Sequence, residues 1–452
     1  MAFYMVPVLG RWLVHAPLAD STALVNATAA AWLRAGRRTG GPDRWSEFCA
    51  ALTAEQPGLV ETREAGLNPQ FLGLVTTRAC NLACVYCGFA AGGARGHMAT
   101  ATAVAAIDWM AQRMHDLGRK RLEVHFFGGE PSVAWDVLEV AVHRTRAAAA
   151  RHGLCPRLEI ATNGVFDAPR ARFLGDYFDT VVLSFDGPQE IQDRHRPACR
   201  GRGSFEAVAL TARRLSESPT ELCLRICVTE ETVGRLEEIT SWFCQTFRPS
   251  TLTYETLRPT AESAAAGLEP PDPYEFAAHS LRARKVAAGY GVRALYAAAL
   301  TDARHFSFCP VGNDSLIVLP DGRVCACYLP AREWEARGLD LELGRLTSDG
   351  AMNLDLGAAA RLRRLVRDKP RCRSCFCRWS CAGGCYVDHS FPGCPETYDG
   401  FCIQTRLITT CSLLWELGYG DLVESFLRDR RAMERLAMQP SDQPEDCEDA
   451  VA

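Results

Sequence analysis

Three cysteines stand close together in the sequence Cys80-Asn-Leu-Ala-Cys84-Val-Tyr-Cys87. Three thiolates on one short loop can hold three irons of a [4Fe–4S] cluster, which leaves the fourth iron open to a small molecule. A zinc site is the alternative, but structural zinc takes four ligands and usually uses cysteine pairs with two to four residues between them. The spacing therefore favours an iron–sulfur cluster with an open iron.

The chain of 452 residues has 21 cysteines, and a second group of them lies in its last third. These are Cys309, Cys327, Cys372, Cys375, Cys381, Cys385 and Cys402. A chain of this length does not need disulfides to fold, so clustered cysteines indicate metal ligands or redox groups. Because residues 303–402 show little hydrophobic periodicity, we expect their fold to depend on metal. Other cysteines lie in apolar patterns and are expected in the core: Cys49, Cys155, Cys223, Cys227, Cys244 and Cys411.

Polar or small residues also recur where expected strands end. They are Gly128, Gly129 and Glu130 after the second strand, Asn163 after the third, and Ser184 and Asp186 at the end of the fourth. Two glycines let a ligand approach the backbone closely, and the Glu130 carboxylate could accept hydrogen bonds from an amino group. Each motif alone also suits an ordinary turn. Their recurrence at successive strand ends indicates a site.

The elements that must position these residues alternate between strand and helix from about residue 71 to 300. The expected strands are Phe71–Thr76, Arg121–Phe127, Arg157–Ala161, Thr180–Phe185, Leu222–Thr229 and Thr251–Thr256. The expected helices are Ala101–Leu117, Val133–Arg151, Ala168–Tyr177, Ser204–Ser216, Leu236–Thr246 and Pro273–Ala288. The strands are short and apolar, as strands buried on both faces are. Six such units predict an α/β fold with a parallel sheet, as a partial barrel or a doubly wound sheet, and a site at the carboxyl ends of the strands.

Smaller segments flank this core. Residues 1–68 predict an α+β module with strands at Phe3–Leu9, Trp12–His15 and Thr22–Val25 and helices at Ala27–Ala35 and Trp45–Thr53. The expected divisions are 1–68, 69–300, 301–412 and 413–452, the last with helices over Leu413–Met438 and an acidic, disordered tail.

Composition excludes other classes. The formal net charge of −4 argues against a nucleic-acid binder. No apolar run approaches the ~18 residues of a membrane span, so we expect no membrane association. The first residues lack the basic start of a signal peptide, and Arg11 and His15 interrupt their apolar stretch. We therefore expect a cytoplasmic protein whose thiols stay reduced.

The first cysteine motif, with Tyr86 before its last cysteine, resembles the signature of radical S-adenosylmethionine (SAM) enzymes. The resemblance covers about residues 70–300 and implies a partial (β/α)6 barrel. It implies that Cys80, Cys84 and Cys87 hold a cluster whose open iron binds SAM. It further implies SAM-binding roles for Tyr86, Gly128, Gly129, Glu130, Asn163, Ser184 and Asp186. Gln192–Arg196 resembles the family's His-Asp-x-x-Arg, which adds Asp193 and Arg196, although a solvated charged loop is the alternative.

The second group of cysteines looks like a SPASM domain, the auxiliary-cluster module of peptide- and protein-modifying radical SAM enzymes. In that pattern Cys372, Cys375, Cys381 and Cys402 hold one auxiliary [4Fe–4S] cluster, and Cys309, Cys327 and Cys385 contribute to another. With the SAM cluster this makes three clusters; structural zinc is the alternative. The missing fourth ligand is either Cys325, two residues before Cys327 on one strand face, or an open site. We expect the open site.

Two departures bear on the substrate. Anaerobic sulfatase maturases carry an aspartate, proposed as a base, directly after the cysteine that matches Cys327, whereas this chain has Tyr328. They also carry an extra cysteine after the one that matches Cys309, where this chain has Asn313, Asp314 and Ser315. Tyr328 becomes the candidate catalytic residue at that position, and sulfatase maturation is not favoured.

The resemblance implies a maturase that cleaves SAM reductively to a 5′-deoxyadenosyl radical and abstracts hydrogen from a ribosomally made peptide or protein. A crosslink, thioether or oxidation would result. The expected partners are the precursor and an electron donor such as flavodoxin or ferredoxin. Residues 1–68 resemble leader-binding domains, which add a leader peptide as a strand; a cap over the barrel mouth is the alternative. A small-molecule radical SAM dehydrogenase and a non-catalytic iron–sulfur scaffold remain open, although a scaffold needs no SAM pocket.

Overall fold

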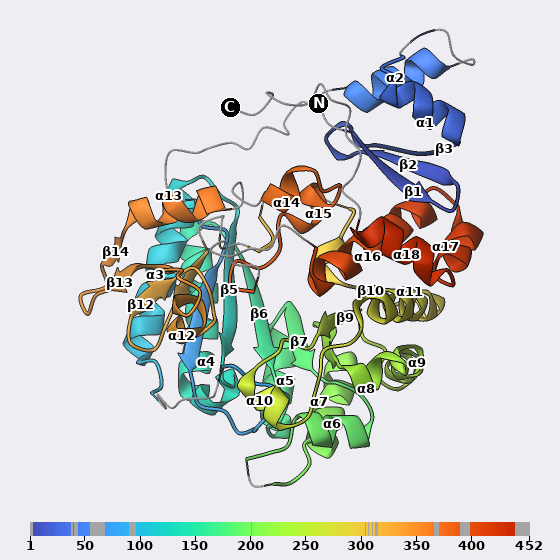
Figure 1. The fold of residues 1–452 in the computed structure, drawn as a ribbon. Helices are drawn as coiled ribbons and strands as arrows, with labels where there is room; N and C mark the ends of the chain where they lie inside the picture. Colours follow the sequence, from blue (N-terminus) through green and yellow to red (C-terminus); the bar gives the residue numbers. More distant parts are fainter. Residues whose placement is uncertain are drawn as a thin grey trace.

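The computed structural model describes residues 3–37, 39, 44–54, 68–89, 96–199, 201–302, 304–305, 307–309, 311, 315–365, 370–388 and 398–438. Within these residues the strands form a three-stranded sheet and an eleven-stranded sheet (Figure 1). The expected acidic tail lies outside the described residues. No described helix combines the length and the apolar character needed to cross a membrane.

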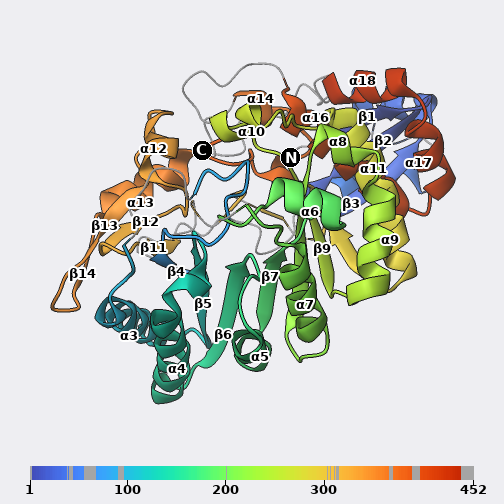
Figure 2. The same cartoon turned by 90° about the horizontal axis from the view of Figure 1, so that it is seen from below.

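Six parallel strands follow one another in the middle of the large sheet. They are β4 (Leu72–Thr77), β5 (Arg121–Gly128), β6 (Cys155–Thr162), β7 (Thr180–Ser184), β8 (Glu221–Val228) and β9 (Thr251–Thr256). Their outer face is covered by α3 (Thr100–Asp116), α4 (Trp135–His152), α5 (Ala168–Tyr177), α7 (Phe205–Ser216), α9 (Leu236–Phe247) and α11 (Pro273–Gly289) (Figure 2). The α/β class and the parallel barrel sheet are confirmed.

The two faces of the barrel strands differ in polarity. In β5, Leu122, Val124 and Phe126 are buried, while the alternate residues are half-buried. The same alternation in β8 places Arg225 between two half-buried cysteines, Cys223 and Cys227. The expectation of strands buried on both faces therefore holds for β4 and is wrong for these strands, because their inner face is partly accessible and polar.

The other cysteines that we expected in the core differ in their burial. Cys49, Cys244 and Cys411 are buried, as expected. Cys155 is exposed, because it begins β6 at the solvent-facing end of the strand. The apolar pattern therefore identified buried positions on helices better than positions on the barrel strands.

The large sheet continues beyond the barrel at both ends. At one end β10 (Arg293–Leu295) pairs with β9. At the other, β11 (Leu316–Val318) pairs parallel with β4 and is followed by the antiparallel strands β12 (Arg323–Cys325), β13 (Glu342–Leu346) and β14 (Met352–Leu354). The helices of this region are α12 (Ala331–Glu335), α13 (Leu356–Leu365), α14 (Pro370–Arg373) and α15 (Arg378–Cys381). Hydrogen bonding of the sheet thus crosses the division expected at residue 300.

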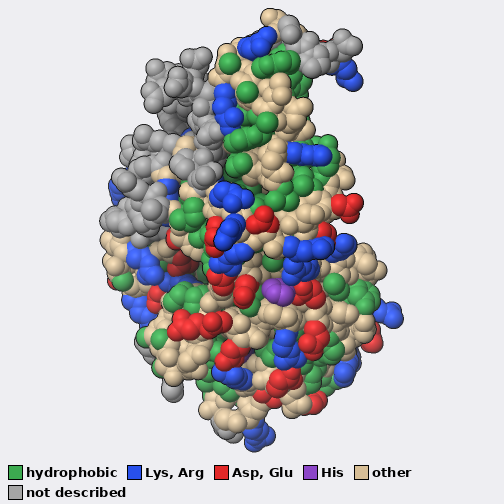
Figure 3. Space-filling view, turned by 45° about the vertical axis from the view of Figure 1, so that its right-hand side comes forward, with side chains coloured by type: hydrophobic (Ala, Val, Ile, Leu, Met, Phe, Trp, Pro, Cys, Tyr) green, Lys and Arg blue, Asp and Glu red, His purple; other side chains and the backbone are tan. Residues whose placement is uncertain are grey.

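The N-terminal module forms the upper lobe of Figure 1, where Figure 3 shows hydrophobic side chains at the surface. It contains β1 (Tyr4–Val8), β2 (Arg11–Ala16), β3 (Ser21–Val25), α1 (Ala27–Arg34) and α2 (Trp45–Thr53). Phe3 and Met5 pack in a small core with both helices, whereas Tyr4, Val6 and Val8 join the main core. The module is therefore docked on the rest of the chain, with β3 at the edge of its sheet.

Three C-terminal helices complete the fold: α16 (Gly400–Glu416), α17 (Gly420–Phe426) and α18 (Arg430–Met438). Helix α18 contacts β1, and α16 packs against α11. One helix, α16, crosses the division expected at residue 412. The remaining short helices are η1 (Pro17–Ala19), η2 (Pro131–Ala134), α6 (Gln189–His195), α8 (Glu230–Val233), α10 (Ala261–Ala265) and η3 (Ala297–Ala299).

Candidate functional site

The loop after β4 carries the first three cysteines, and it is held by a second segment that follows α6. The Ala83 amide donates to the Pro197 carbonyl at 2.7 Å, and the Val85 amide donates to the His195 carbonyl at 3.0 Å. These backbone hydrogen bonds fix the course of the loop through its cysteine motif.

Cys80, Cys84 and Cys87 line one cavity of about 1130 Å³. Burial raises the pKa of the Cys80 thiol to about 12 and that of the Cys84 thiol to about 11. A metal must displace these protons to bind thiolates. Three thiols that line one roomy cavity fit a cluster with an open iron. Among the described residues, no three side chains of the ligand types converge closely enough to hold a single metal ion.

The two glycines at the end of β5 accommodate the start of the cysteine loop. A Cβ atom on Gly129 would lie 2.3 Å from the Ala79 carbonyl oxygen, and one on Gly128 would lie 2.3 Å from that of Thr77. The amides of Gly129 and Glu130 donate to the same two carbonyls, both at 2.9 Å. We expected a ligand to lie close to these two glycines. The chain's own backbone occupies that space instead.

Glu130 is 1% exposed and connects the ends of neighbouring strands. Its carboxylate accepts hydrogen bonds from the Ser132 amide at 2.9 Å, the Thr162 hydroxyl at 2.9 Å and the Asn163 amide at 2.7 Å. Burial raises the pKa of Glu130, and these donors oppose that rise. Glu130 thus positions Asn163 at the end of β6.

Asn163 in turn braces the cysteine loop. Its Nδ2 donates to Asn81 Oδ1 at 2.8 Å and lies 3.5 Å from Cys80 Sγ. Asn81 donates back to the Val165 carbonyl at 2.7 Å. The residue expected near SAM therefore also orients the first cysteine of the motif.

Asp186 is fully buried and joins several predicted site residues. Its carboxylate accepts from Tyr86 Oη at 2.5 Å, from Arg196 at 3.0 and 3.1 Å, and from the Cys227 amide at 3.0 Å. His195 Nδ1 lies 3.2 Å away. Although burial alone would raise it, Arg196 and His195 hold the pKa of Asp186 well below its usual range. Arg196 also bonds to Cys84, which ties this buried ion pair to the cluster loop.

Gln192 and Asp193, which precede Arg196, have different roles. Gln192 belongs to the network around Asp186, and Asp193 does not. Gln192, which departs from the family's histidine, accepts from the Asp186 amide at 2.9 Å and donates to Ser204 at 3.1 Å. Asp193 instead accepts from the Phe205 amide at 2.8 Å and stabilises the start of α7. The structure therefore brings Arg196 to the site and leaves Asp193 outside it. Ser184 lies at the end of β7, in register with Arg225.

Tyr328 lies against the inner face of the barrel. Its ring packs on Phe127 with centroids 4.6 Å apart, and Gly73 leaves room for it, since a Cβ there would lie 2.5 Å from the phenol oxygen. Burial raises its pKa well above the ordinary value. In the described part of the chain the buried hydroxyl has no hydrogen-bond partner. A buried hydroxyl without an acceptor is uncommon.

The cysteines of the C-terminal region lie in two places. Burial chiefly raises the pKa of Cys385, and the nearby Asp388 and Cys309 add to it. Burial also raises the pKa of Cys402, with contributions from the nearby thiols of Cys381 and Cys375. Cys309 therefore lies near Cys385, and Cys375 and Cys381 lie near Cys402.

Cys325 belongs to neither group. It is 2% exposed and packs in an apolar cluster with Val75, Ile317 and Leu319, at the junction of β4, β11 and β12. These contacts favour a packed thiol over a cluster ligand.

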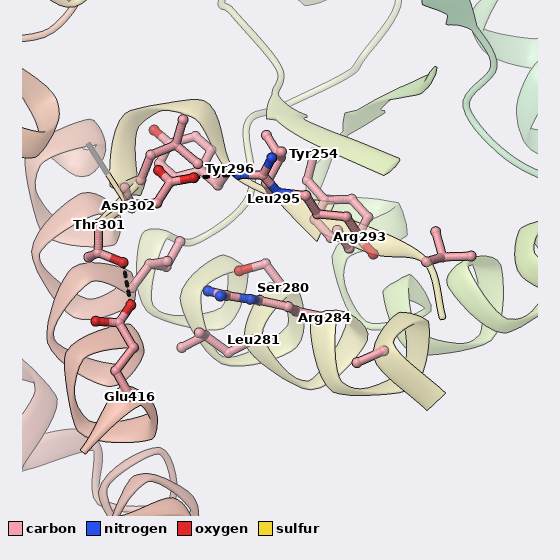
Figure 4. Close-up of a pocket in the computed structure, with 16 residues that line it drawn as sticks. Tyr254, Ser280, Leu281, Arg284, Arg293, Leu295, Tyr296, Thr301, Asp302 and Glu416 are labelled. Atoms are coloured by element: carbon pink, nitrogen blue, oxygen red, sulfur yellow. Dashed lines mark hydrogen bonds and ion pairs between the residues drawn. The ribbon is translucent and has the colours of Figure 1, made fainter. Parts of the chain in front are cut away.

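A second cavity, of about 410 Å³, lies on the outside of the barrel between α11, β10 and α16 (Figure 4). Arg284 and Leu281 of α11 point into it, and Thr301 donates to Glu416 at its edge. None of the predicted site residues lines this cavity. The chemistry that the cysteines indicate therefore belongs to the larger cavity.

Comparison with known proteins agrees with this arrangement. Residues 74–243 match the radical SAM superfamily, so the chain contains a radical SAM domain. It is 28% identical over 371 residues to mycofactocin maturase MftC of Mycobacterium ulcerans, covering 78% of this chain and 93% of that one. The fold matches anSMEcpe with bound AdoMet and Cp18Cys peptide (TM-score 0.59, 18% identity, 79% and 99% of the two chains). It also matches Streptococcus suis SuiB bound to S-adenosylmethionine (0.52, 13%, 85% and 95%).

Proposed function

We propose that this protein, a radical SAM enzyme, is a maturase that modifies a ribosomally made precursor peptide. The observation that carries the proposal is the cavity of about 1130 Å³ that contains all three motif cysteines. Small-molecule sites usually occupy roughly 300–1,000 Å³, so this cavity has room for a second, larger ligand beside SAM. The similarity to a mycofactocin maturase, which covers 93% of that protein, supports the same conclusion.

The residues of this chain would have three roles in the reaction. Cys80, Cys84 and Cys87 would hold the SAM-binding [4Fe–4S] cluster, while Asp186 and Arg196 fix the loop behind them. When bound, the cluster and SAM would supply the radical chemistry that removes a hydrogen atom from the substrate. The Tyr328 hydroxyl, buried beside the barrel wall, is the group that we assign to hold or donate a proton near the substrate.

The direct test is anaerobic incubation of the reconstituted enzyme with SAM, a reductant and the peptide encoded by a short open reading frame beside its gene. We expect 5′-deoxyadenosine and a mass change in the peptide, read by mass spectrometry. A mass change on a sugar alcohol or cofactor precursor, with none on the peptide, would favour a small-molecule dehydrogenase instead. Binding of iron without any SAM cleavage would favour a scaffold.

We also propose two auxiliary [4Fe–4S] clusters, with Cys325 outside both. Reconstituted enzyme is then expected to hold about 12 irons per chain. Cys325→Ala should keep that number, since Cys325 packs among aliphatic side chains. The matched variant Cys327→Ala should lose about four irons, measured by iron analysis and electron paramagnetic resonance. Loss of four irons in Cys325→Ala would show that Cys325 closes the first auxiliary site.

The N-terminal module is proposed to bind the leader of the precursor along β3, one of the two edge strands of its sheet. Removing residues 1–68 should weaken binding of the full-length precursor by about tenfold or more, because strand addition supplies several backbone hydrogen bonds of about 0.5–1.5 kcal/mol each. Binding of a leaderless peptide, reductive SAM cleavage and iron content should stay as in the intact chain. Equal affinity of both forms for the precursor would favour a cap over the barrel.

The reaction that we propose consumes electrons, so it needs a donor such as flavodoxin or ferredoxin. The cytoplasm keeps thiols reduced and is therefore the compartment that we infer.

A further inference from the structure

Arg78 occupies a position between the cysteine loop and Tyr328. It lies two residues before Cys80, in the turn that leaves β4, and it lines the same cavity as the three motif cysteines. Its Nη1 donates to the Tyr328 carbonyl at 3.1 Å. This contact holds the guanidinium across the gap between the barrel and the C-terminal region.

Arg78 lines the cavity and has more hydrogen-bond donors than it has described acceptors. A guanidinium has five N–H groups, and the Tyr328 carbonyl is the one acceptor that Arg78 meets among the described residues. No described carboxylate lies within ion-pair distance of it. Burial lowers its pKa, yet an arginine stays charged. A half-buried cation with free donors is favourable only where an anion or water completes its hydrogen bonds.

Among the described residues that line the cavity, the two other arginines are already paired with carboxylates. Arg323 binds Asp321 at 2.8 Å, and Arg332 lies against Glu333. The thiol groups of Cys325 and Cys327 also lie near Arg78. Arg78 is therefore the described cation of this cavity that is left to meet a ligand.

We propose that Arg78 binds a carboxylate of the peptide substrate and so places an acidic residue, or the C-terminal residue, next to the SAM cluster and Tyr328. This inference rests on the proposed function and deepens it by naming the substrate class. An arginine fork takes a carboxylate by two parallel hydrogen bonds, which gives orientation as well as affinity. The methionine carboxylate of SAM offers the same chemistry, so the test must separate the two sources.

The experiment measures peptide binding to cluster-loaded enzyme with saturating SAM and no reductant, by ligand-observed NMR. The probes are acetyl-Ala-Glu-Ala-amide, acetyl-Ala-Gln-Ala with a free C-terminus, and acetyl-Ala-Gln-Ala-amide, which lacks a carboxylate. Enzyme variants are Arg78→Gln, Arg78→Lys and, as a charge-matched control, Arg121→Gln at the exposed start of β5. Iron content and circular dichroism show whether each variant is folded.

We expect the wild type and Arg121→Gln to bind one carboxylate peptide about tenfold or more tightly than the amide peptide. Arg78→Gln should lose this preference, and Arg78→Lys should keep part of it, with SAM affinity unchanged in both. Equal binding of all three peptides by the wild type would overturn the inference, while peptide modification in the mass-spectrometric assay would still support the maturase. Weaker SAM binding by Arg78→Gln without a change in peptide preference would assign the residue to SAM and overturn it as well.

Discussion

Enzyme in which Cys80, Cys84 and Cys87 are all replaced by alanine is expected to form no 5′-deoxyadenosine above background. The three thiols line one cavity, and no other described cysteine lies in the same turn of chain. Without them the cluster loses every protein ligand, so SAM has no iron to bind. Anaerobic assays with dithionite, followed by chromatography of the nucleoside, measure the effect.

Two controls make this result specific. The auxiliary absorbance should persist, since its proposed ligands lie in the C-terminal region. Cys199→Ala removes an exposed thiol that lines the same cavity outside the motif, and it should leave SAM cleavage near the wild-type level. Residual cleavage in the triple variant would mean that the SAM-binding cluster has other ligands.

Asp186→Asn is expected to lower the free energy of unfolding by about 3–5 kcal/mol. The substitution keeps the shape of the side chain and removes the charge that Arg196 faces inside the protein. A buried cation is then left without its counter-charge, and the Tyr86 hydroxyl loses an ionised acceptor. Urea denaturation of the two proteins, followed by circular dichroism, measures the difference.

The matched control is Asp193→Asn, seven residues further along. Asp193 accepts one backbone amide at the start of α7, so its loss should cost no more than about 1 kcal/mol. If both substitutions have the same small effect, the buried ion pair does not stabilise the site.

The same pair predicts a dependence on pH. The folded-state pKa of Asp186 is depressed, whereas an unfolded aspartate has a pKa of about 3.9. The stability that Asp186 contributes is therefore complete above about pH 4 and is lost as the pH falls further. The wild type should lose stability in that range by more than Asp186→Asn does.

Local patterns predicted the barrel well. The six expected strands differ from β4 to β9 by at most two residues at either end, because alternating or continuous apolar side chains define each strand within a short window. The cysteine loop and the residues after each strand could be placed for the same reason, since parallel strands bring their carboxyl ends together.

Contacts between distant residues could not be predicted in this way. Nothing near Gly73 indicates that it makes room for Tyr328, which lies 255 positions later in the chain. Gly128 and Gly129 suggested a ligand, yet the backbone that passes over them belongs to residues 77–79. The role of Gln192 was also missed, because the family has a histidine at this position. The Gln192 side chain accepts a hydrogen bond from the Asp186 amide, as a histidine could.

The pairing of β4 with β11 also constrains how the protein is made. Strand β4 ends at Thr77, and its partner on that side begins at Leu316. A ribosome adding about 5–20 residues per second needs roughly 10–50 s to reach the partner strand. During that time the first barrel strand has an open edge, which can pair with another chain. The speed of translation and the action of chaperones therefore determine how long the edge of β4, the strand that leads into the cysteine loop, stays unpaired. In a fragment that ends at residue 300 this edge stays unpaired permanently.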